Sequence, residues 1–112
     1  MFYRQSDDGY REVLPRIEMK TLVNGNQTLV TEFRMRGGSV LPVHLHQYEQ
    51  TGYLIKGRLR LTIGGEAFDA RPGDSWCILG NVEHGAEVLE DSVALEVFSP
   101  PRPDYLPAQG QA

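Results

Sequence analysis

The sequence is poor in cysteine and in long hydrophobic runs. Its one cysteine, Cys77, cannot form an internal disulfide, which fits a reducing compartment. No stretch approaches the roughly 20 apolar residues that a membrane-spanning helix needs. No apolar run follows a basic stretch near the start, so we expect no signal peptide. The expectation is therefore a cytoplasmic protein that makes no contact with a membrane.

A strong positive charge is also missing. The net charge is −4 at pH 7 and no basic patch could hold a phosphate backbone, so nucleic acid is not an expected partner. A small anionic ligand is still compatible with this charge, because a pocket sets its own local field. The 112 residues are 40% hydrophobic and 23% charged, which is typical of one globular domain, and we place that domain at residues 1–112.

A sustained 3.6-residue apolar period is absent as well, so the sequence predicts few helices. Instead, 12 glycines and seven prolines separate short apolar runs, a pattern typical of many short strands. The expected strands cover residues 17–23, 28–36, 58–63, 75–79, 85–89 and 93–98. Gly64 and Gly65 suit a tight hairpin turn after the third of them. These features predict an all-β sandwich or barrel with its core at about residues 13–99.

Side chains alternate clearly along the strand at 28–36. One of its faces carries Leu29, Thr31, Phe33 and Met35. The tail at 100–112 begins with prolines, which lack the backbone donor that a strand needs. We expect this tail to be extended, with Tyr105 and Leu106 as a possible anchor and with loose residues at 108–112.

Three histidines suggest a metal site. His44 and His46 lie two apart, so on a strand both imidazoles project from the same face. His84 lies far along the chain after a turn, where a neighbouring strand could bring it opposite the pair. A single histidine is most often an ordinary surface or core residue. A His-x-His pair with a third histidine in a β-rich chain instead favours a site for one divalent ion, because such an ion needs ligands that converge from one side.

The residues around the first two histidines resemble the first sequence motif of the cupin family. The matching positions, at the spacing of that motif, are Gly38, His44, His46, Gln50 and Gly57. Gln50 stands where most cupins have glutamate. The resemblance implies a small antiparallel β-barrel or jelly roll that binds one divalent metal ion.

The second cupin motif is matched by Gly73, Asp74 and His84. The chain departs from this motif at Leu79, where proline is usual, and at Asn81, where glycine is usual. Together the two motifs extend the resemblance over about residues 29–99. The family's metal ligands map onto His44, His46, Gln50 and His84.

Gln50 changes the chemistry that this site would support. Glutamine offers a neutral carbonyl oxygen where glutamate offers an anion, so the charge of a bound dication stays largely uncompensated. That favours a Lewis acid role over redox chemistry. The adjacent Glu49 is an alternative ligand, but strand alternation allows only one of the two to face the ion. The donor set suits Zn, Ni, Fe, Mn or Cu.

A narrower resemblance links the chain to the small pectin-degradation cupins. It is carried by residues 46–53, 57, 62–66, 72–76 and 97–100. Members of that subgroup convert 4,5-unsaturated monouronates into linear keto-uronates, so the resemblance implies a metal-dependent enzyme of uronate catabolism that acts on an anionic sugar acid. Its pocket residues map onto Glu96, Phe98 and Arg102, with glutamate where aspartate is expected. These would be a proton-transfer group, an apolar contact to the sugar and a carboxylate anchor that also belongs to the catalytic set.

Other interpretations of these residues remain open. Glu96 points to solvent if Val93, Leu95 and Val97 fill the barrel; if Glu96 faces the lumen, that apolar face needs a cover, which predicts a homodimer. Arg102 is equally compatible with a solvated charge in the tail. Tyr53 and Trp76 could line the pocket, but aromatic residues of this kind more often belong to the core. Cys77, in the middle of a strand, is expected to be a small buried hydrophobic residue. Two alternative functions are an iron- or manganese-dependent dioxygenase and a non-catalytic module that binds sugar acids.

Overall fold

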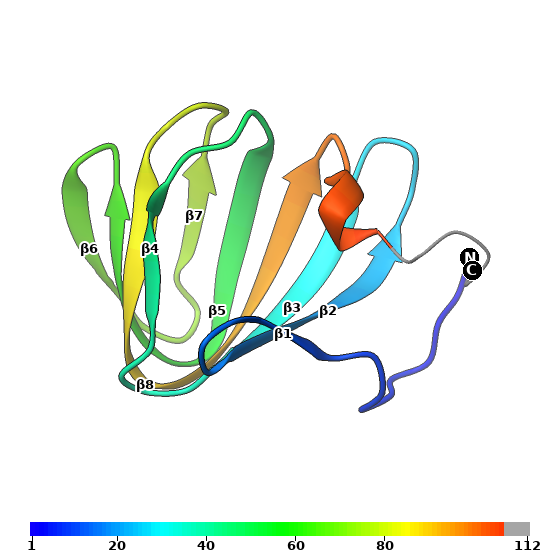
Figure 1. Cartoon of the computed structure of the whole chain (residues 1–112), viewed down its shortest axis with the longest axis horizontal. Helices are drawn as coiled ribbons and strands as arrows, with labels where there is room; N and C mark the ends of the chain where they lie inside the picture. Colours follow the sequence, from blue (N-terminus) through cyan, green and yellow to red (C-terminus); the bar gives the residue numbers. More distant parts are fainter. Residues whose placement is uncertain (107–112) are drawn as a thin grey trace.

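The structure is a computed structural model that describes residues 1–106, and it is built almost entirely from strands (Figure 1). The strands are β1 (Arg11–Leu14), β2 (Ile17–Asn24), β3 (Leu29–Met35), β4 (Val40–His44), β5 (Glu49–Ile63), β6 (Glu66–Ala70), β7 (Ser75–Ile78) and β8 (His84–Ser99). One 3-10 helix, η1 (Pro103–Tyr105), follows them. The predicted all-β class is confirmed, and within residues 1–106 no helix is long and apolar enough to cross a bilayer.

All strand pairs are antiparallel, in the order β1-β2-β3-β8-β5-β6, with β4 added beside β8 and β7 beside β5. The two longest strands, β5 and β8, pair along most of their length and belong to both sides of the fold. The two ends of this pair have different neighbours. At the end formed by the start of β5 and the end of β8, the neighbours are β7 and β3; at the opposite end they are β6 and β4. In Figure 1, β4 and β6 stand on one side of the view and β2 and β3 on the other, and the sheet curves between them.

The bend in β5 and β8 depends on a glycine. Gly57 has a φ of 94°, and a Cβ there would lie 2.1 Å from the Ser92 hydroxyl oxygen. That hydroxyl accepts a hydrogen bond from the Arg58 N–H at 3.1 Å, where the β5–β8 register shifts. Bulges of this kind increase the twist and curvature of a sheet. The bend lets one pair of strands wrap around the interior.

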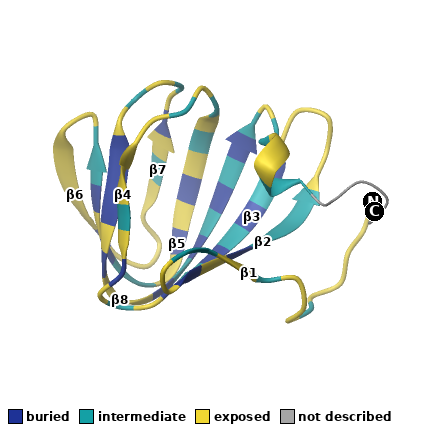
Figure 2. Ribbon diagram, in the orientation of Figure 1, coloured by how far each residue is buried: buried dark blue, intermediate teal, exposed yellow. Residues whose placement is uncertain are grey.

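The interior follows the alternation that the sequence predicts. Leu29, Thr31, Phe33 and Met35 of β3 are all buried. Figure 2 shows buried bands alternating with more exposed ones along the strands. The predicted hairpin at Gly64 and Gly65 joins β5 to β6, and both residues have positive φ.

Strand β8 and the tail differ from the sequence prediction. The strands expected at 85–89 and 93–98 form one continuous strand, β8, because Ser92 bridges to Arg58 across the polar interval that suggested a break. The tail is not wholly extended, since Pro103–Tyr105 form η1. Tyr105 and Leu106 pack against the core as the expected anchor, and the expectation for 108–112 lies outside the described residues.

Candidate metal centre

The three histidines meet at one end of the β4–β8 ladder. His44 is the last residue of β4 and pairs in register with His84, the first residue of β8. The expectation that His44 and His46 share a strand is wrong for His46, which lies in the loop after β4. There its carbonyl accepts a hydrogen bond from the Asn81 N–H at 2.7 Å instead of a ladder partner. The nearest ligand nitrogens of the three rings nevertheless lie within 4.8 Å of one another.

Backbone carbonyls orient each of the three rings in the same way. The Nδ1 atoms of His44 and His84 lie 2.8 Å from the Pro42 and Val82 carbonyl oxygens, and Nδ1 of His46 lies 3.0 Å from that of Tyr48. A carbonyl oxygen can only accept, so Nδ1 carries the proton and Nε2 carries the lone pair. This is the tautomer that binds a metal through Nε2, and such backbone partners are typical of metal-ligating histidines.

Burial favours the neutral form of two of the rings, His46 and His84. Desolvation is the main cause that lowers the pKa of His46 and of His84, and the positive charge of Arg102 lowers the pKa of His46 further. His84 is only 5% exposed, and its Nε2 is a buried polar atom without a hydrogen-bond partner among the described residues. An unpartnered buried nitrogen is costly unless something binds it. A divalent ion fits this need, because it binds imidazole nitrogens at about 2.1 Å.

Gln50 supplies an oxygen to the same place. Its Oε1 lies 3.1 Å from Nε2 of His46, while its Nε2 donates to the two carboxylate oxygens of Glu96 at 3.0 and 3.2 Å. Both atoms of the first contact carry lone pairs, so a cation between them would satisfy both. Glu49 is exposed, as strand alternation requires once Gln50 faces inward. The geometry therefore favours Gln50 over Glu49 as the oxygen ligand.

Glu96 faces the interior. It is 6% exposed, and the alternative in which it points to solvent is wrong. Besides the Gln50 amide, the Trp76 indole N–H donates to Glu96 Oε1 at 2.8 Å. Burial raises the pKa of the Glu96 carboxyl to about 7, against the opposing effect of these two hydrogen bonds.

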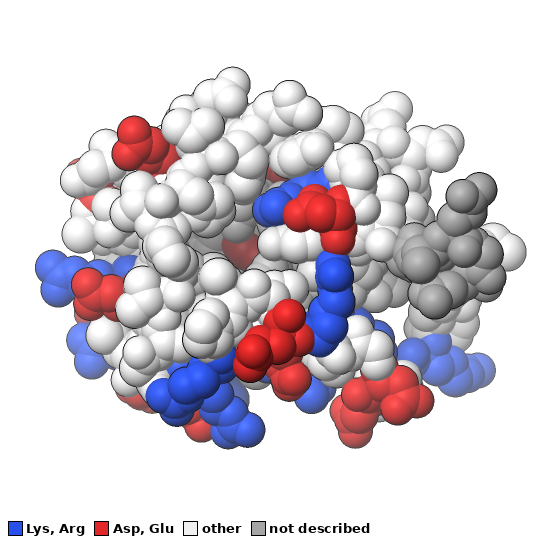
Figure 3. Space-filling model, in the orientation of Figure 1, with Lys and Arg blue, Asp and Glu red and all other residues white. Residues whose placement is uncertain are grey.

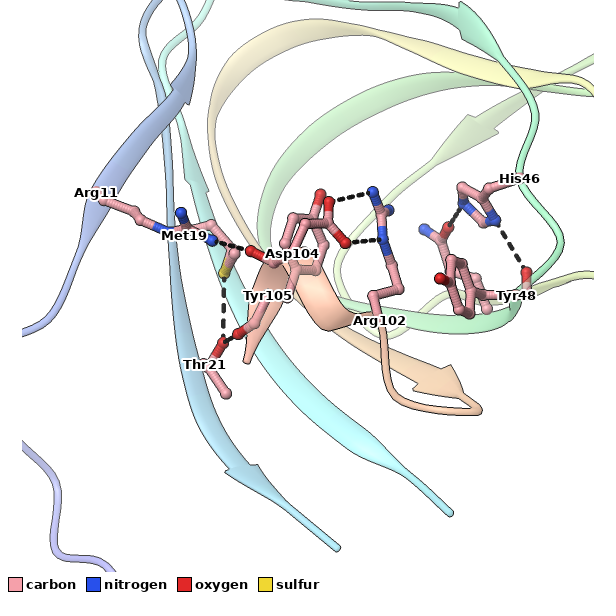
Figure 4. Close-up of polar contacts among 9 residues, drawn as sticks. Arg11, Met19, Thr21, His46, Tyr48, Arg102, Asp104 and Tyr105 are labelled. Carbon is pink, nitrogen blue, oxygen red and sulfur yellow. Dashed lines mark hydrogen bonds and ion pairs between the residues drawn. The ribbon is translucent and has the colours of Figure 1, made fainter. Parts of the chain in front are cut away.

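One cavity of about 630 Å³ is lined by Glu96, by Gln50, by His44 and His84 of the histidine cluster, and by the tail. Phe98 forms part of its wall, and Arg102 reaches it from the tail with a side chain that is 16% exposed, so Arg102 is no freely solvated charge. Asp104 holds the Arg102 guanidinium through Nε and Nη2 at 3.3 and 2.9 Å, and the guanidinium lies 4.0 Å from the centre of the Tyr105 ring. Figure 4 shows Arg102 between Asp104 and the Tyr48–His46 pair, and Figure 3 shows this face hollowed near its centre.

Sequence reasoning missed the role of Trp76. It lines the cavity and contacts Glu96, whereas Tyr53 and Cys77, also expected in the core, are exposed on the outer face of the sheet. Only the pairing of β5 with β7 places Trp76 beside the site, and that pairing is not local in sequence. Asn81 could have been predicted from the sequence to have a positive φ, because it stands where cupins usually have glycine and asparagine tolerates this region better than most residues. Its φ is 65°.

Comparison with known proteins agrees with this geometry. The pectin degradation protein KdgF of Dickeya dadantii is 25% identical over 107 residues, which cover 94% of this chain and 97% of that protein. The structure of KdgF from a Halomonas species matches with a TM-score of 0.89 and 29% identity, covering 95% of this chain and 98% of that one.

An RmlC-like cupin from Shewanella frigidimarina matches in fold, with a TM-score of 0.89, 21% identity, and coverage of 94% of this chain and 95% of that one. The cupin domain family matches residues 31–99, more than half of the chain. The predicted resemblance is thereby confirmed, and the chain belongs to the cupin family as a small cupin that resembles the KdgF proteins.

Proposed function

We propose that this cupin is a metal-dependent enzyme that converts 4,5-unsaturated monouronates to linear keto-uronates. The observation that carries the proposal is that one cavity is lined by two of the three clustered histidines, His44 and His84, together with the buried Glu96 carboxylate and the Arg102 guanidinium. The likeness to two proteins named KdgF, one of them described as a pectin degradation protein, supports the same substrate class. The ion would be held by His44, His46, Gln50 and His84.

The substrate is an enol ether that must gain a proton at C4 and water at C5. The bond from C5 to the ring oxygen then breaks, which leaves a ketone at C5 and the hydrated aldehyde at C1. A bound divalent ion would supply Lewis acidity that polarises a substrate oxygen. Glu96 is the residue that moves the proton at C4, because it is a buried carboxyl group in the cavity wall.

Arg102 and Phe98 bind the sugar acid in this proposal. Arg102 has five N–H donors, of which Asp104 engages those on Nε and Nη2, so donors remain for the uronate carboxylate. Phe98 offers an apolar wall to the sugar ring. An uncompensated dication and an arginine together favour an anionic ligand even though the net charge of the chain is −4.

We also propose a homodimer in the cytoplasm. Because Glu96 faces inward, Val93, Leu95 and Val97 face outward, where they are only partly buried. Tyr53 pairs in register with Leu95 and is 47% exposed, so it extends this apolar face onto β5. A second copy of the chain would cover the face, and the exposed thiol of Cys77 fits a reducing compartment.

The test follows an unsaturated monouronate by proton NMR with metal-loaded protein, chelator-treated protein and the Glu96→Gln variant. We expect the vinyl proton signal at C4 to disappear faster than the spontaneous rate only with the metal-loaded wild-type protein. Glu96→Gln should slow this reaction about 100-fold, in the range that general acid–base groups contribute.

A vinyl signal that decays at the background rate with metal-loaded protein would rule out uronate ring opening. Binding of the uronate without turnover would then indicate a sugar-acid-binding module. Oxygen consumption with a phenolic or diketone substrate would instead indicate a dioxygenase.

A further inference from the structure

Gln50 and Glu96 form a hydrogen-bonded pair in which the amide nitrogen of Gln50 donates to the carboxylate of Glu96. The orientation of the amide and the charge state of the carboxyl group therefore depend on each other. The Gln50 amide faces two kinds of group at once: the imidazole Nε2 of His46 on one side and the Glu96 carboxylate on the other. A carboxylate only accepts, so the amide must turn its NH₂ to Glu96 and its oxygen to the histidines. Glu96 thus determines which atom of Gln50 faces the metal cluster.

Trp76 holds the far side of Glu96. The indole N–H lies 2.8 Å from Oε1 and 3.3 Å from Oε2 of the carboxylate. The Thr31 hydroxyl donates to the Glu96 backbone carbonyl at 2.9 Å, which fixes the main chain as well. The result is one chain of donors and acceptors that runs from the indole through the carboxylate to the ligand amide.

Gly52 has no side chain, and this leaves room for the hydrogen bond between the Trp76 indole and the Glu96 carboxylate. A Cβ at Gly52 would lie 2.1 Å from Trp76 Nε1 and 2.3 Å from Glu96 Oε1, distances that no real contact shows. Gly52 pairs in register with both Trp76 and Glu96, so its missing side chain opens the gap between β7 and β8 on the inner face. The backbone there is built around the indole–carboxylate contact.

We infer that Trp76 is a positioning residue for the ligand at position 50, and that Glu96 has the same effect on this ligand in addition to its proposed role in proton transfer. The neutral ligand Gln50 and the buried acid Glu96 are then interdependent. Glutamate at position 50, the usual cupin ligand, would place two carboxyl groups about 3 Å apart, as the present spacing of 3.0 Å requires. They would either repel each other as two anions or have to share a proton. Exchanging the two residues together restores every contact. In that arrangement the amide introduced at position 96 accepts from Trp76 and donates to the new carboxylate at position 50, which faces the ion. The inference rests on the metal site of the proposed function and does not depend on its substrate.

The test is a cycle of four proteins: wild type, Gln50→Glu, Glu96→Gln and the double variant. Two quantities are measured, the unfolding midpoint in chelator and the dissociation constant for Zn²⁺ by competition with a chelating dye. Gln50→Glu should lower the metal-free midpoint by about 5 °C or more, because two carboxyl groups this close either repel each other or must bind a proton. The double variant should return the midpoint to near the wild-type value and bind Zn²⁺ at least as tightly as wild type.

Trp76→Phe tests the other end of the chain, since it keeps an aromatic ring and removes only the donor. We expect its dissociation constant for Zn²⁺ to rise about tenfold, as for other partners that orient metal ligands. Glu49→Gln is the matched control, because it makes the same chemical change as Glu96→Gln at the exposed neighbour of Gln50. It should change neither quantity.

Additive effects would overturn the inference: Glu96→Gln would then change the midpoint of the Gln50→Glu protein no more than that of wild type. Unchanged Zn²⁺ affinity in Trp76→Phe would overturn it as well. Wild-type protein that binds no divalent ion would overturn both this inference and the proposed function. A wild type that binds Zn²⁺ tightly but opens no uronate would contradict the proposed function alone.

Discussion

The two faces of the C-terminal half of β8 reverse the usual distribution of polar and apolar residues. On the inner face, Glu96 lies between Ala94 and Phe98, and all three are buried. On the outer face lie Val93, Leu95 and Val97, which are only partly buried. A carboxylate is therefore better shielded from water than three aliphatic side chains on the same strand.

This comparison shows that the interior at this end of the fold is a binding site as well as a core. A buried carboxylate is costly unless hydrogen bonds compensate it, and here donors from β5 and β7 do so. The outer face has no such compensation among residues 1–106, and a cover of apolar surface would stabilise it. The buried carboxylate on the inner face is thus typical of a functional site, and the uncovered apolar residues on the outer face favour association with a second copy of the chain.

The largest expected effect comes from removing a histidine on the inner side. His84→Ala should weaken Zn²⁺ binding by more than the roughly 10- to 100-fold that loss of an orienting partner costs, because it removes a ligand itself. Isothermal titration calorimetry measures the affinity. Glu83→Ala, at the exposed neighbouring position, is the control and should bind as wild type does. Equal affinities for His84→Ala and wild type would show that the ion, if bound, lies elsewhere.

A smaller but still severe effect is expected at Gly52. In Gly52→Ala the new methyl group must displace the Trp76 indole or the Glu96 carboxylate, so we expect metal affinity and kcat/KM each to fall at least about tenfold, as when a metal-orienting partner is lost. Gly25→Ala is the control, because a Cβ at Gly25 meets nothing within 4 Å. Wild-type kinetics in Gly52→Ala would mean that the contact between indole and carboxylate is dispensable.

Arg102 should act on substrate binding more than on the chemical step. Arg102→Lys keeps the positive charge and loses the planar fork, so KM should rise about tenfold, the equivalent of about 1.4 kcal/mol, with little change in kcat. Steady-state kinetics by the NMR assay separate the two constants. Arg71→Lys, at an exposed ion pair with Asp69, should leave both unchanged. A fall in kcat at constant KM would assign Arg102 to the chemical step.

A substitution on the outer face of β8 should change the oligomeric state of the protein and leave its activity unchanged. Leu95→Lys places a charge in the centre of the apolar face, so the mass measured by light scattering should fall from that of a dimer to the 12.6 kDa of one chain. Leu89→Lys is the matched control, since Leu89 is an exposed leucine in the other half of β8. A wild-type protein that is already monomeric would exclude the proposed dimer.

Local sequence signals predicted part of this molecule well. The alternation in Leu29–Met35 and the hairpin at Gly64 and Gly65 depend on neighbouring residues only, and both predictions are confirmed. The three histidines were also expected to form one site, and their rings do meet, although His46 reaches the site from a loop and not from the strand that the two-residue spacing predicted. The continuous β8 escaped prediction, because the polar residues near Ser92 suggested a break and their hydrogen bonds to the distant Arg58 were not visible in the sequence.

The predictions that failed concern which face of a strand is covered. Tyr53 and Cys77 were expected inside and are exposed, whereas Trp76 reaches the metal side of the cavity. Alternation along β5 and β7 correctly separates Tyr53 from Gln50 and Cys77 from Trp76. It does not say which set lies inside, because both sets contain large apolar residues.

The sequence by itself determined the all-β class, the turns, the family and the residues that could bind a metal, because these depend on local alternation, on backbone preferences of glycine and proline, and on motif spacing. The tertiary structure alone decided that Glu96 faces inward, that the Gln50 amide presents its oxygen to His46 and that the Trp76 indole donates to Glu96. The contacts of Glu96 join residues that are 20 and 46 positions apart along the chain, and only the pairing of β5 with β7 and β8 in the folded sheet brings these side chains together.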